Sequence, residues 1–295
     1  MIKVIINADD LGKSPEVNRE IGRALKDGAI TSSTILANSQ YWEEIHEIVD
    51  SNPQASFGVN LNLTEGEALT NSNVFLKYQI VDNSNKFTRK IFEFLDVEKL
   101  QDDLSDAIYN EWDRQIGKVV NVERVSITHV DGHHHIHHYY ALSSILLRLV
   151  NKYNIKICRR RYAYPTNRRT KLVVNMVRKL ATEINYLNLI KIGNIGNIGN
   201  GNKYYSLINS NMAVSLWMRR FDKLCVTDYF DSYRHFVSQV TKGNQISKDS
   251  VIELMCHPGH EMYADEMSLI RSNTLQRLIS DVAVVSYKDW DSCIY

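Results

Sequence analysis

Histidine is concentrated in one short segment of this 295-residue chain. Six of the ten histidines lie between His129 and His138. Imidazole is the commonest metal-binding side chain, and it also serves in proton transfer because it titrates near neutral pH. The segment is internal, which excludes an affinity tag, and a solvated polar loop would have no use for so many histidines. The cluster therefore predicts a metal-binding or catalytic site, in which some histidines bind an ion and the rest have supporting roles.

Two further segments place similar side chains directly after apolar, strand-like runs. Asp9 and Asp10 are adjacent carboxylates, which repel each other unless a cation or a shared proton lies between them. The alternative is an acidic pair that caps the helix beginning near Ser14. His257 precedes a proline and a glycine, which predict a turn, although a structural role is equally compatible with a single histidine. Cys256 is not expected to pair with His257 as a nucleophile, because adjacent residues of a strand point to opposite faces.

The elements that must position these residues follow from hydrophobic periodicity. Short β-branched runs alternate with longer segments of helical period, which predicts parallel strands covered by helices, as a barrel or as an open sheet. Strands are expected at 3–6, 33–37, 57–63, 125–128, 155–158, 225–227, 251–256 and 282–286. Helices are expected at 15–26, 42–49, 100–116, 141–150, 230–240 and 268–279. The candidate residues thus follow strands, and both architectures place active sites at the carboxyl ends of strands.

Composition excludes several classes of protein. The 35 basic and 34 acidic side chains give a net charge of +1, so nothing favours nucleic acid or an anionic membrane as a partner. The chain has no apolar run of 18 residues, which excludes a membrane-spanning helix, and the early acidic pair excludes a signal peptide. Four widely spaced cysteines predict reduced thiols and a cytoplasmic location.

No linker divides the chain, so a single domain over residues 1–295 is expected. The segment 193–202 is rich in glycine and asparagine, with glycines mostly at every third position. This spacing differs from that of a phosphate-binding loop, and we interpret the segment as a low-complexity surface loop. Together, the carboxylates and imidazoles favour a divalent-metal site that performs hydrolysis. From the residues alone, the substrate stays undefined.

Five stretches of the sequence resemble the YdjC-like carbohydrate deacetylases, the family that includes chitooligosaccharide deacetylase. These stretches are NADDLG at 7–12, DGAITSST at 27–34, GVNLNLT at 58–64, THVDGHHHIH at 128–137 and ELMCHPG at 253–259. In order and spacing they extend over most of the chain, with a poorly matched region near 160–225. The resemblance implies a single irregular, TIM-like (β/α) barrel. It also implies hydrolysis of the N-acetyl group of an amino sugar.

Carried over to this chain, the resemblance implies that Asp10 and His133 bind one divalent metal ion and that Asp9 is the general base. At the position of the family's second histidine ligand, this sequence has Asn60. An amide oxygen is neutral and harder than imidazole, which favours Mg²⁺ over Zn²⁺ without excluding Zn²⁺. We therefore expect an ion on Asp10, Asn60 and His133.

The expected mechanism assigns a role to each remaining candidate. Asp9 would take a proton from the attacking water, and His257 would protonate the departing amine. His129 or Asp131 would orient a metal-binding imidazole. Arg159 would hydrogen-bond the sugar or the product acetate, or would be a solvated surface arginine.

Two other functions stay open at this point. Asn60 could disable the site and leave a carbohydrate-binding relative without catalysis. A metal-dependent phosphoesterase on a similar barrel is the second alternative, and it would usually hold a second metal ion. In the favoured interpretation the partner is an N-acetylated sugar, and a homodimer is plausible for the family.

Overall fold

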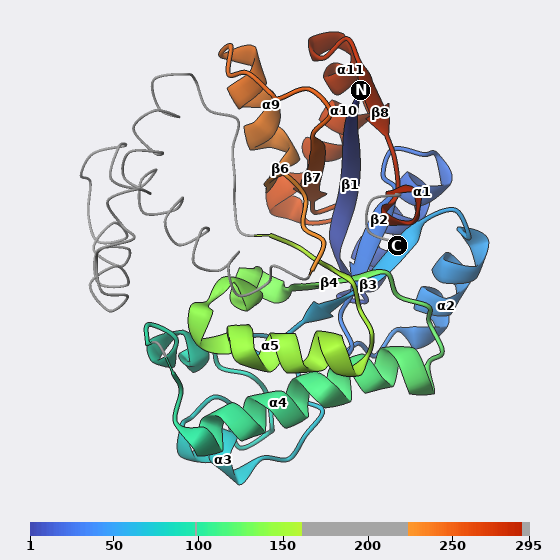
Figure 1. Ribbon diagram of the computed structural model, residues 1–295. Coiled ribbons are helices and arrows are strands. Elements are labelled where there is room, and N and C mark those ends of the chain that lie inside the picture. The colour runs from blue at the N-terminus through green and yellow to red at the C-terminus, as the bar shows by residue number, and fades with distance from the viewer. Residues whose placement is uncertain (98, 161–223, 291–295) are drawn as a thin grey trace, which may run out of the picture.

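The computed structural model describes residues 1–97, 99–160 and 224–290 (Figure 1). The Gly/Asn-rich segment 193–202 and Cys293 lie outside the described residues. Neighbouring strands are parallel and follow the order β5-β4-β3-β2-β1-β7-β6, while β8 pairs with the amino-terminal half of β1. The strands are β1 (Ile2–Leu11), β2 (Ser32–Ile35), β3 (Ser56–Leu61), β4 (His129–Gly132), β5 (Ile157–Cys158), β6 (Tyr229–Ser232), β7 (Val251–Cys256) and β8 (Val282–Val284).

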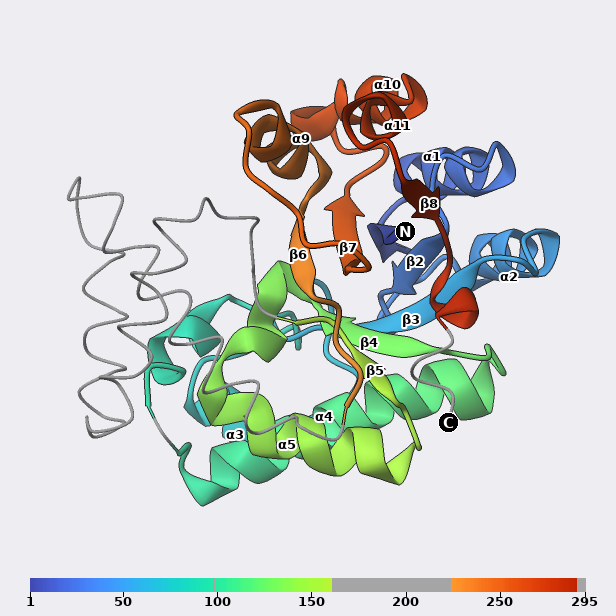
Figure 2. The ribbon, with the colours of Figure 1, turned by 45° about the horizontal axis from the view of Figure 1, so that its top comes forward.

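The sheet curls, and the helices lie around its outer side (Figure 2). In the described part of the chain, the two end strands β5 and β6 are not paired with each other. The alternation of parallel strands and helices is therefore confirmed, whereas a closed TIM-like barrel is not. The α-helices are α1 (Pro15–Lys26), α2 (Trp42–Ser51), α3 (Asn73–Lys77), α4 (Asp102–Gly117), α5 (Tyr140–Lys152), α9 (Tyr233–Thr241), α10 (Glu266–Arg271) and α11 (Thr274–Leu278).

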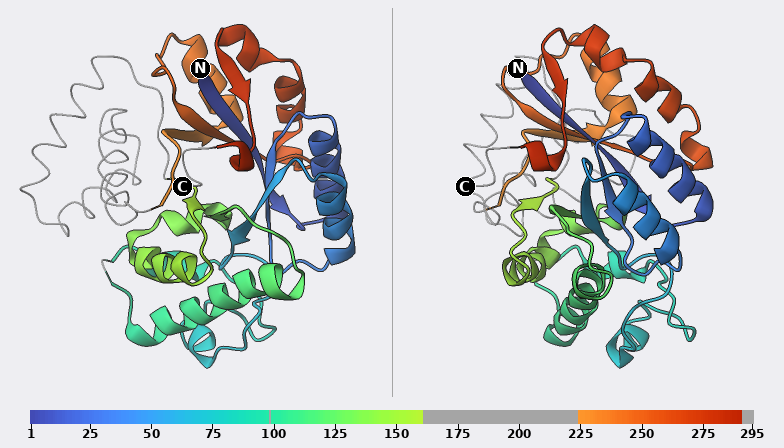
Figure 3. Two further views of the ribbon diagram at one scale, coloured as in Figure 1. Left: turned by 45° about the vertical axis from the view of Figure 1, so that its right-hand side comes forward. Right: turned by 90° about the vertical axis from the view of Figure 1, so that its right-hand side faces the viewer.

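The first helix begins and ends as its sequence predicts. The Ser14 hydroxyl accepts a hydrogen bond from the Val17 amide, and Pro15 occupies the first turn, where no intrahelical donor is needed. Gly28 follows the helix with a φ of 73°, a conformation that costs glycine little. α1 and the neighbouring α2 lie side by side against the outer side of the sheet (Figure 3).

Two predicted elements are displaced. The strand predicted at 125–128 lies instead at His129–Gly132, and the one predicted at 225–227 lies at Tyr229–Ser232. Both observed strands carry polar residues, which face the inner side of the curled sheet near the carboxyl ends of its strands. Apolar periodicity therefore places these strands too early. The helix predicted at 268–279 is divided into α10 and α11, because Asn273 between them has a φ of 54°.

One face of β1 packs in the main hydrophobic core, and the other face lies on the inner side of the sheet, where the candidate site is. Val4, Ile6 and Ala8 belong to the main hydrophobic core beneath the helices. On the other face, Ile5 packs with Tyr287 in a small inner cluster. The inward positions beyond Ile5 in β1 are polar, so the inner side of the sheet changes from apolar to polar toward the carboxyl ends.

Cysteine and membrane predictions have different outcomes. Cys158 and Cys256 are buried free thiols, whereas Cys225 forms a disulfide, so the prediction of four reduced thiols is wrong at that position. Among the described residues, no helix combines the length and the apolar character that crossing a membrane requires.

Candidate active site

A bulge near the end of β1 lets adjacent carboxylates face the same site. The pairing of β1 with β2 shifts in register between Ala8 and Leu11, and Asp10 has a φ of 72°. A non-glycine residue adopts this left-handed conformation rarely, and such bulges redirect side chains next to active sites. In a regular strand Asp9 and Asp10 would point to opposite faces. The bulge therefore explains how two consecutive residues both serve the site.

Asp10 contacts the other two predicted metal ligands. Its Oδ1 lies 2.7 Å from Nδ1 of His133 and accepts a hydrogen bond of 3.0 Å from the Asn60 side-chain amide. Asp10, Asn60 and His133 come from the carboxyl ends of β1 and β3 and from the residue after β4, and all three are buried. The structure thus brings together three side chains that are far apart in the sequence.

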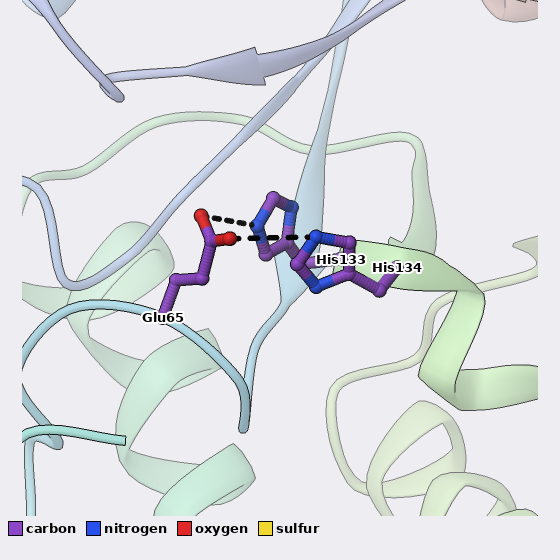
Figure 4. A group of neighbouring side chains, drawn as sticks. All are labelled: Glu65, His133 and His134. Carbon is purple, nitrogen blue, oxygen red and sulfur yellow. Dashed lines mark hydrogen bonds and ion pairs between the residues drawn. The ribbon is translucent and has the colours of Figure 1, made fainter. Parts of the chain in front are cut away.

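Glu65 approaches the same histidine from the other side. One carboxylate oxygen of Glu65 lies 3.1 Å from Nε2 of His133, and the other lies 3.5 Å from Nε2 of His134 (Figure 4). Glu65, His133 and His134 present ligand atoms within 4.8 Å of one another, and they form a candidate metal-binding group among the described residues. His133 therefore contacts one carboxylate through each of its ring nitrogens.

These two carboxylates hold a proton on His133. Burial alone would lower the pKa of His133, but Asp10 and Glu65 raise it to about 9. Burial would likewise raise the pKa of Asp10, yet His133 holds it well below its usual range. A proton and a metal ion compete for such a nitrogen, so a cluster that stabilises imidazolium also attracts a cation. The donor set of carboxylate, amide and imidazole fits a divalent ion.

One buried atom supports this fit. The side chain of Asn60 has no exposed surface, and its Oδ1 has no hydrogen-bond partner among the residues that the structure describes. An unpaired buried carbonyl oxygen costs about 1–3 kcal/mol, so it is expected to have a ligand in the working protein. Turned toward Asp10, this oxygen would repel the carboxylate unless a cation lay between them.

A second cluster surrounds Arg159, whose side chain is fully buried. The guanidinium donates two hydrogen bonds to Asp9, of 2.7 and 2.6 Å. It also contacts Asp131 at 2.8 Å and Glu253 through Nε. Arg159 was predicted to contact sugar or acetate, or to lie on the surface; here three protein carboxylates surround it, and its plane packs over the ring of Phe230.

Arg159 decides which of these carboxylates is ionised. Burial would raise the pKa of Asp9, but the paired guanidinium lowers it below its usual range. Burial raises the pKa of Asp131 well above normal and also raises that of Glu253, since a single guanidinium does not offset the burial of all three groups. Asp9 is therefore the carboxylate held ionised beside Asp10.

His129 and Asp131 support the site from within β4. The ring of His129 lies 2.8 Å from the Thr128 hydroxyl and 3.3 Å from Oδ1 of Asn7. The Nδ2 group of Asn7 in turn donates a hydrogen bond to Asp9. Asp131 accepts a hydrogen bond from Thr34 and forms an ion pair with Arg159. Both side chains were predicted to orient a metal-binding imidazole; here the partners of His129 and Asp131 lie instead around Asp9 and Arg159.

His257 immediately follows β7, with its backbone amide bonded to Glu266 and its ring stacked on Tyr263 at 4.6 Å. Burial lowers the pKa of His257, although Asp9 and Asp10 act in the opposite direction. The turn predicted after it is present: Gly259 has a φ of 79°, and an added Cβ would lie 2.8 Å from Cα of Val17.

The thiol of Cys256 behaves as the sequence predicts. It is buried, and burial raises its pKa well above the usual value, so it stays protonated. A nucleophilic role beside His257 is accordingly disfavoured.

Sequence reasoning missed three residues that reach the site. His260 lies 3.4 Å from Oδ2 of Asp10, and Lys13 lies 3.7 Å from the same oxygen and 3.0 Å from Glu65. Glu65 follows β3 by a few residues, so the rule that candidates follow strands applies to it as well. Nothing in its spacing, however, connects it to a histidine 68 positions later.

The chain belongs to the YdjC-like protein family, whose model matches residues 3–284. Curated relatives include a carbohydrate deacetylase of Brevibacillus brevis, 31% identical over 160 residues, which are 53% of this chain and 58% of that protein. Another is a carbohydrate deacetylase of Enterococcus faecalis, 35% identical over 158 residues, 52% of this chain and 57% of the relative. The chain therefore aligns with little more than half the length of these relatives.

A solved structure extends the comparison to the whole fold. It is that of an Enterococcus faecalis V583 protein provisionally assigned to cellobiose-phosphate cleavage, with a TM-score of 0.66 and 21% identity. The alignment covers 98% of each chain. At this identity the likeness concerns the fold alone.

Proposed function

We propose that this protein is a metal-dependent hydrolase that removes the N-acetyl group from an amino sugar or oligosaccharide. The contact of Asp10 with Asn60 and His133 carries the proposal, because it joins a carboxylate, an amide and an imidazole from three separate strand ends. Membership of the YdjC-like family and the carbohydrate deacetylases among its relatives support the choice of substrate class.

The proposed ion is held by Asp10, Asn60 and His133, with Mg²⁺ preferred because two of the three ligands are oxygens. When bound, a divalent ion supplies polarisation of the amide carbonyl and activation of a water molecule. The chain's own contribution is a buried and prearranged set of side chains around that position, so little reorganisation is needed during the reaction.

Asp9 is the proposed general base. Arg159 and Asn7 engage both of its oxygens and orient the carboxylate beside Asp10. Its lowered pKa makes it a weak base, so the water whose proton it accepts must be activated. His257, directly after the neighbouring β7, is the proposed donor of a proton to the departing amine.

The direct test is acetate release from N-acetylated chitooligosaccharides and a panel of other N-acetyl sugars. We expect turnover that a chelator abolishes and that added Mg²⁺ or Zn²⁺ restores. Turnover unaffected by the chelator would exclude the metal-dependent mechanism.

The same purified protein distinguishes the remaining alternatives. Sugar binding without bound metal or acetate release would indicate a carbohydrate-binding relative impaired at Asn60. Phosphate release from sugar phosphates together with two bound ions would indicate a phosphoesterase. A cytoplasmic location and a homodimer belong to the proposal, and fractionation and light scattering test them.

A further inference from the structure

His133 presents two ring nitrogens to two different carboxylates. Nδ1 lies 2.7 Å from Asp10, and Nε2 lies 3.1 Å from Glu65. A neutral imidazole binds an ion through one nitrogen and keeps a proton on the other, and this proton is usually donated to an outer partner. The structure therefore offers two positions for an ion, and the carboxylate on the opposite nitrogen would act from outside the ligand set.

At the position beside Nε2 of His133, the Glu65 carboxylate is already neutralised by cationic side chains. Lys13 lies 3.0 Å from one Glu65 oxygen, and Arg89 forms an ion pair with the other. Arg89 also lies 3.3 Å from Nε2 of His134, the nitrogen that would complete a site with Glu65 and His133. An ion bound there would meet two positive side chains, which disfavours this position.

The position beside Asp10 and Nδ1 of His133 has less positive charge around it than the position beside Glu65. The Asp10 side chain is 4% exposed, and within the described ranges its nearest permanent cation is Lys13, at 3.7 Å. The same oxygen that contacts His133 also contacts the Asn60 amide, whose buried Oδ1 has no partner in the described part of the chain. A divalent ion at this position would satisfy that oxygen and balance the carboxylate.

We propose that Glu65 is a positioning residue that holds the Nε2 proton of His133 and so directs Nδ1 to the ion. The inference rests on the proposed metal centre. A carboxylate outside the ligand set orients the imidazole and makes it a stronger donor. In this chain Glu65 would thereby partly offset the neutral Asn60, while Lys13 and Arg89 hold Glu65 in place.

Calorimetric titration of chelator-treated protein with Zn²⁺ or Mg²⁺ tests this assignment. Glu65→Gln keeps the shape but removes the charge, and it should weaken binding by about 10- to 100-fold. Asp10→Asn should abolish detectable binding, and His134→Gln should change it little. Glu67→Gln removes an exposed charge two residues away and is the matched control, expected to bind like the wild type.

The opposite order of metal affinities among these variants would overturn the proposal. If Glu65→Gln or His134→Gln abolishes binding while Asp10→Asn only weakens it, the ion lies on Nε2 and Glu65 is a direct ligand. Wild-type affinity in Glu65→Gln would equally refute a positioning role. The unfolding temperature of each metal-free variant, together with partial recovery of affinity in Glu65→Asp, separates this role from a purely structural one.

The titration is independent of the proposed reaction. If the wild type releases no acetate but the predicted order of affinities holds, the role of Glu65 stands and the proposed function falls. If acetate is released but Glu65→Gln binds metal normally, the function stands and this inference falls.

Discussion

The consecutive residues Asp9 and Asp10 belong to two clusters that balance buried carboxylates by different means. Around Asp9 the positive charge is permanent, because Arg159 is fully buried among Asp9, Asp131 and Glu253. Around Asp10 the positive charge is exchangeable: a proton on His133 provides it in the metal-free protein, and we propose that a metal ion replaces this proton. The cluster around Arg159 therefore holds its side chains in place, whereas the cluster around His133 can bind a cation.

This difference explains why two adjacent aspartates have separate proposed tasks. A carboxylate paired with a buried guanidinium stays ionised and fixed, which suits a base that must not bind the ion itself. A carboxylate whose partner is a histidine can exchange that partner for a cation. Three substitutions test this comparison, and a fourth examines a buried carboxylate outside both clusters.

The largest effect is expected from Arg159→Met, which removes the permanent charge. It leaves the buried, ionised Asp9 without its counter-ion and removes the cation beside Asp131 and Glu253, and breaking a buried pair in this way costs about 3–5 kcal/mol. Urea unfolding should show a loss of this size, a large fraction of the stability of a typical domain.

The control for that experiment is Arg23→Met, which removes an arginine that is 62% exposed in an ion pair with Glu20. Its loss should be barely measurable, since exposed pairs contribute little. Equal stabilities of the Arg159 and Arg23 variants would show that the buried cluster needs no permanent cation.

The second effect is on catalysis. Asp9→Asn should lower acetate release by about 10²- to 10⁴-fold, the usual contribution of a general base. Metal affinity should change little, because Asp9 is held by Arg159 instead of the ion. Kinetics and calorimetry on the same preparation measure both quantities. Unchanged turnover, or loss of the metal together with activity, would contradict the division of roles between Asp9 and Asp10.

A smaller effect is expected at Asn60. Asn60→His supplies a second imidazole and should increase affinity for Zn²⁺ relative to Mg²⁺. The position has no exposed surface, so the larger ring should cost roughly 1–3 kcal/mol in the metal-free protein. Metal titration and urea unfolding measure the two changes. Tighter Zn²⁺ binding without faster acetate release would show that Asn60 is a ligand position but not a catalytic limitation.

The smallest effect concerns a carboxylate outside both clusters. Burial raises the pKa of Asp231 to about 6, although the contact with His235 acts in the opposite direction. The folded chain thus holds this proton more tightly than the unfolded chain, whose carboxyl has an ordinary pKa near 3.8. Stability should therefore decline as pH rises from about 4 to about 6, by roughly 1–3 kcal/mol.

Asp231→Asn should remove that part of the pH dependence, and urea unfolding between pH 4 and 7 measures it. Asp50→Asn, at an exposed position of α2, is the control and should keep the wild-type profile. An unchanged slope in Asp231→Asn would assign the pH dependence to other groups.

Local sequence signals predicted much of the scaffold. The cap at Ser14, the glycine at the end of α1 and the apolar runs of β1 and β7 depend on neighbours within a few residues, and all are present. Prediction was poorer for β4, because its inward residues His129 and Asp131 interrupt the apolar alternation that marks a strand. The polar interior of the sheet is a tertiary property, which a local window does not contain.

The candidate site, too, was predicted in part from the sequence and decided in part by the tertiary structure. The sequence by itself determined which side chains follow the strands, and the family resemblance singled out Asp10, Asn60 and His133, which the fold brings into contact. Only the tertiary structure decided that Arg159 is enclosed by carboxylates and that Glu65 reaches the second nitrogen of His133. These outcomes depend on the bulge in β1 and on the curl and register of the sheet, which join residues 50 to 150 positions apart.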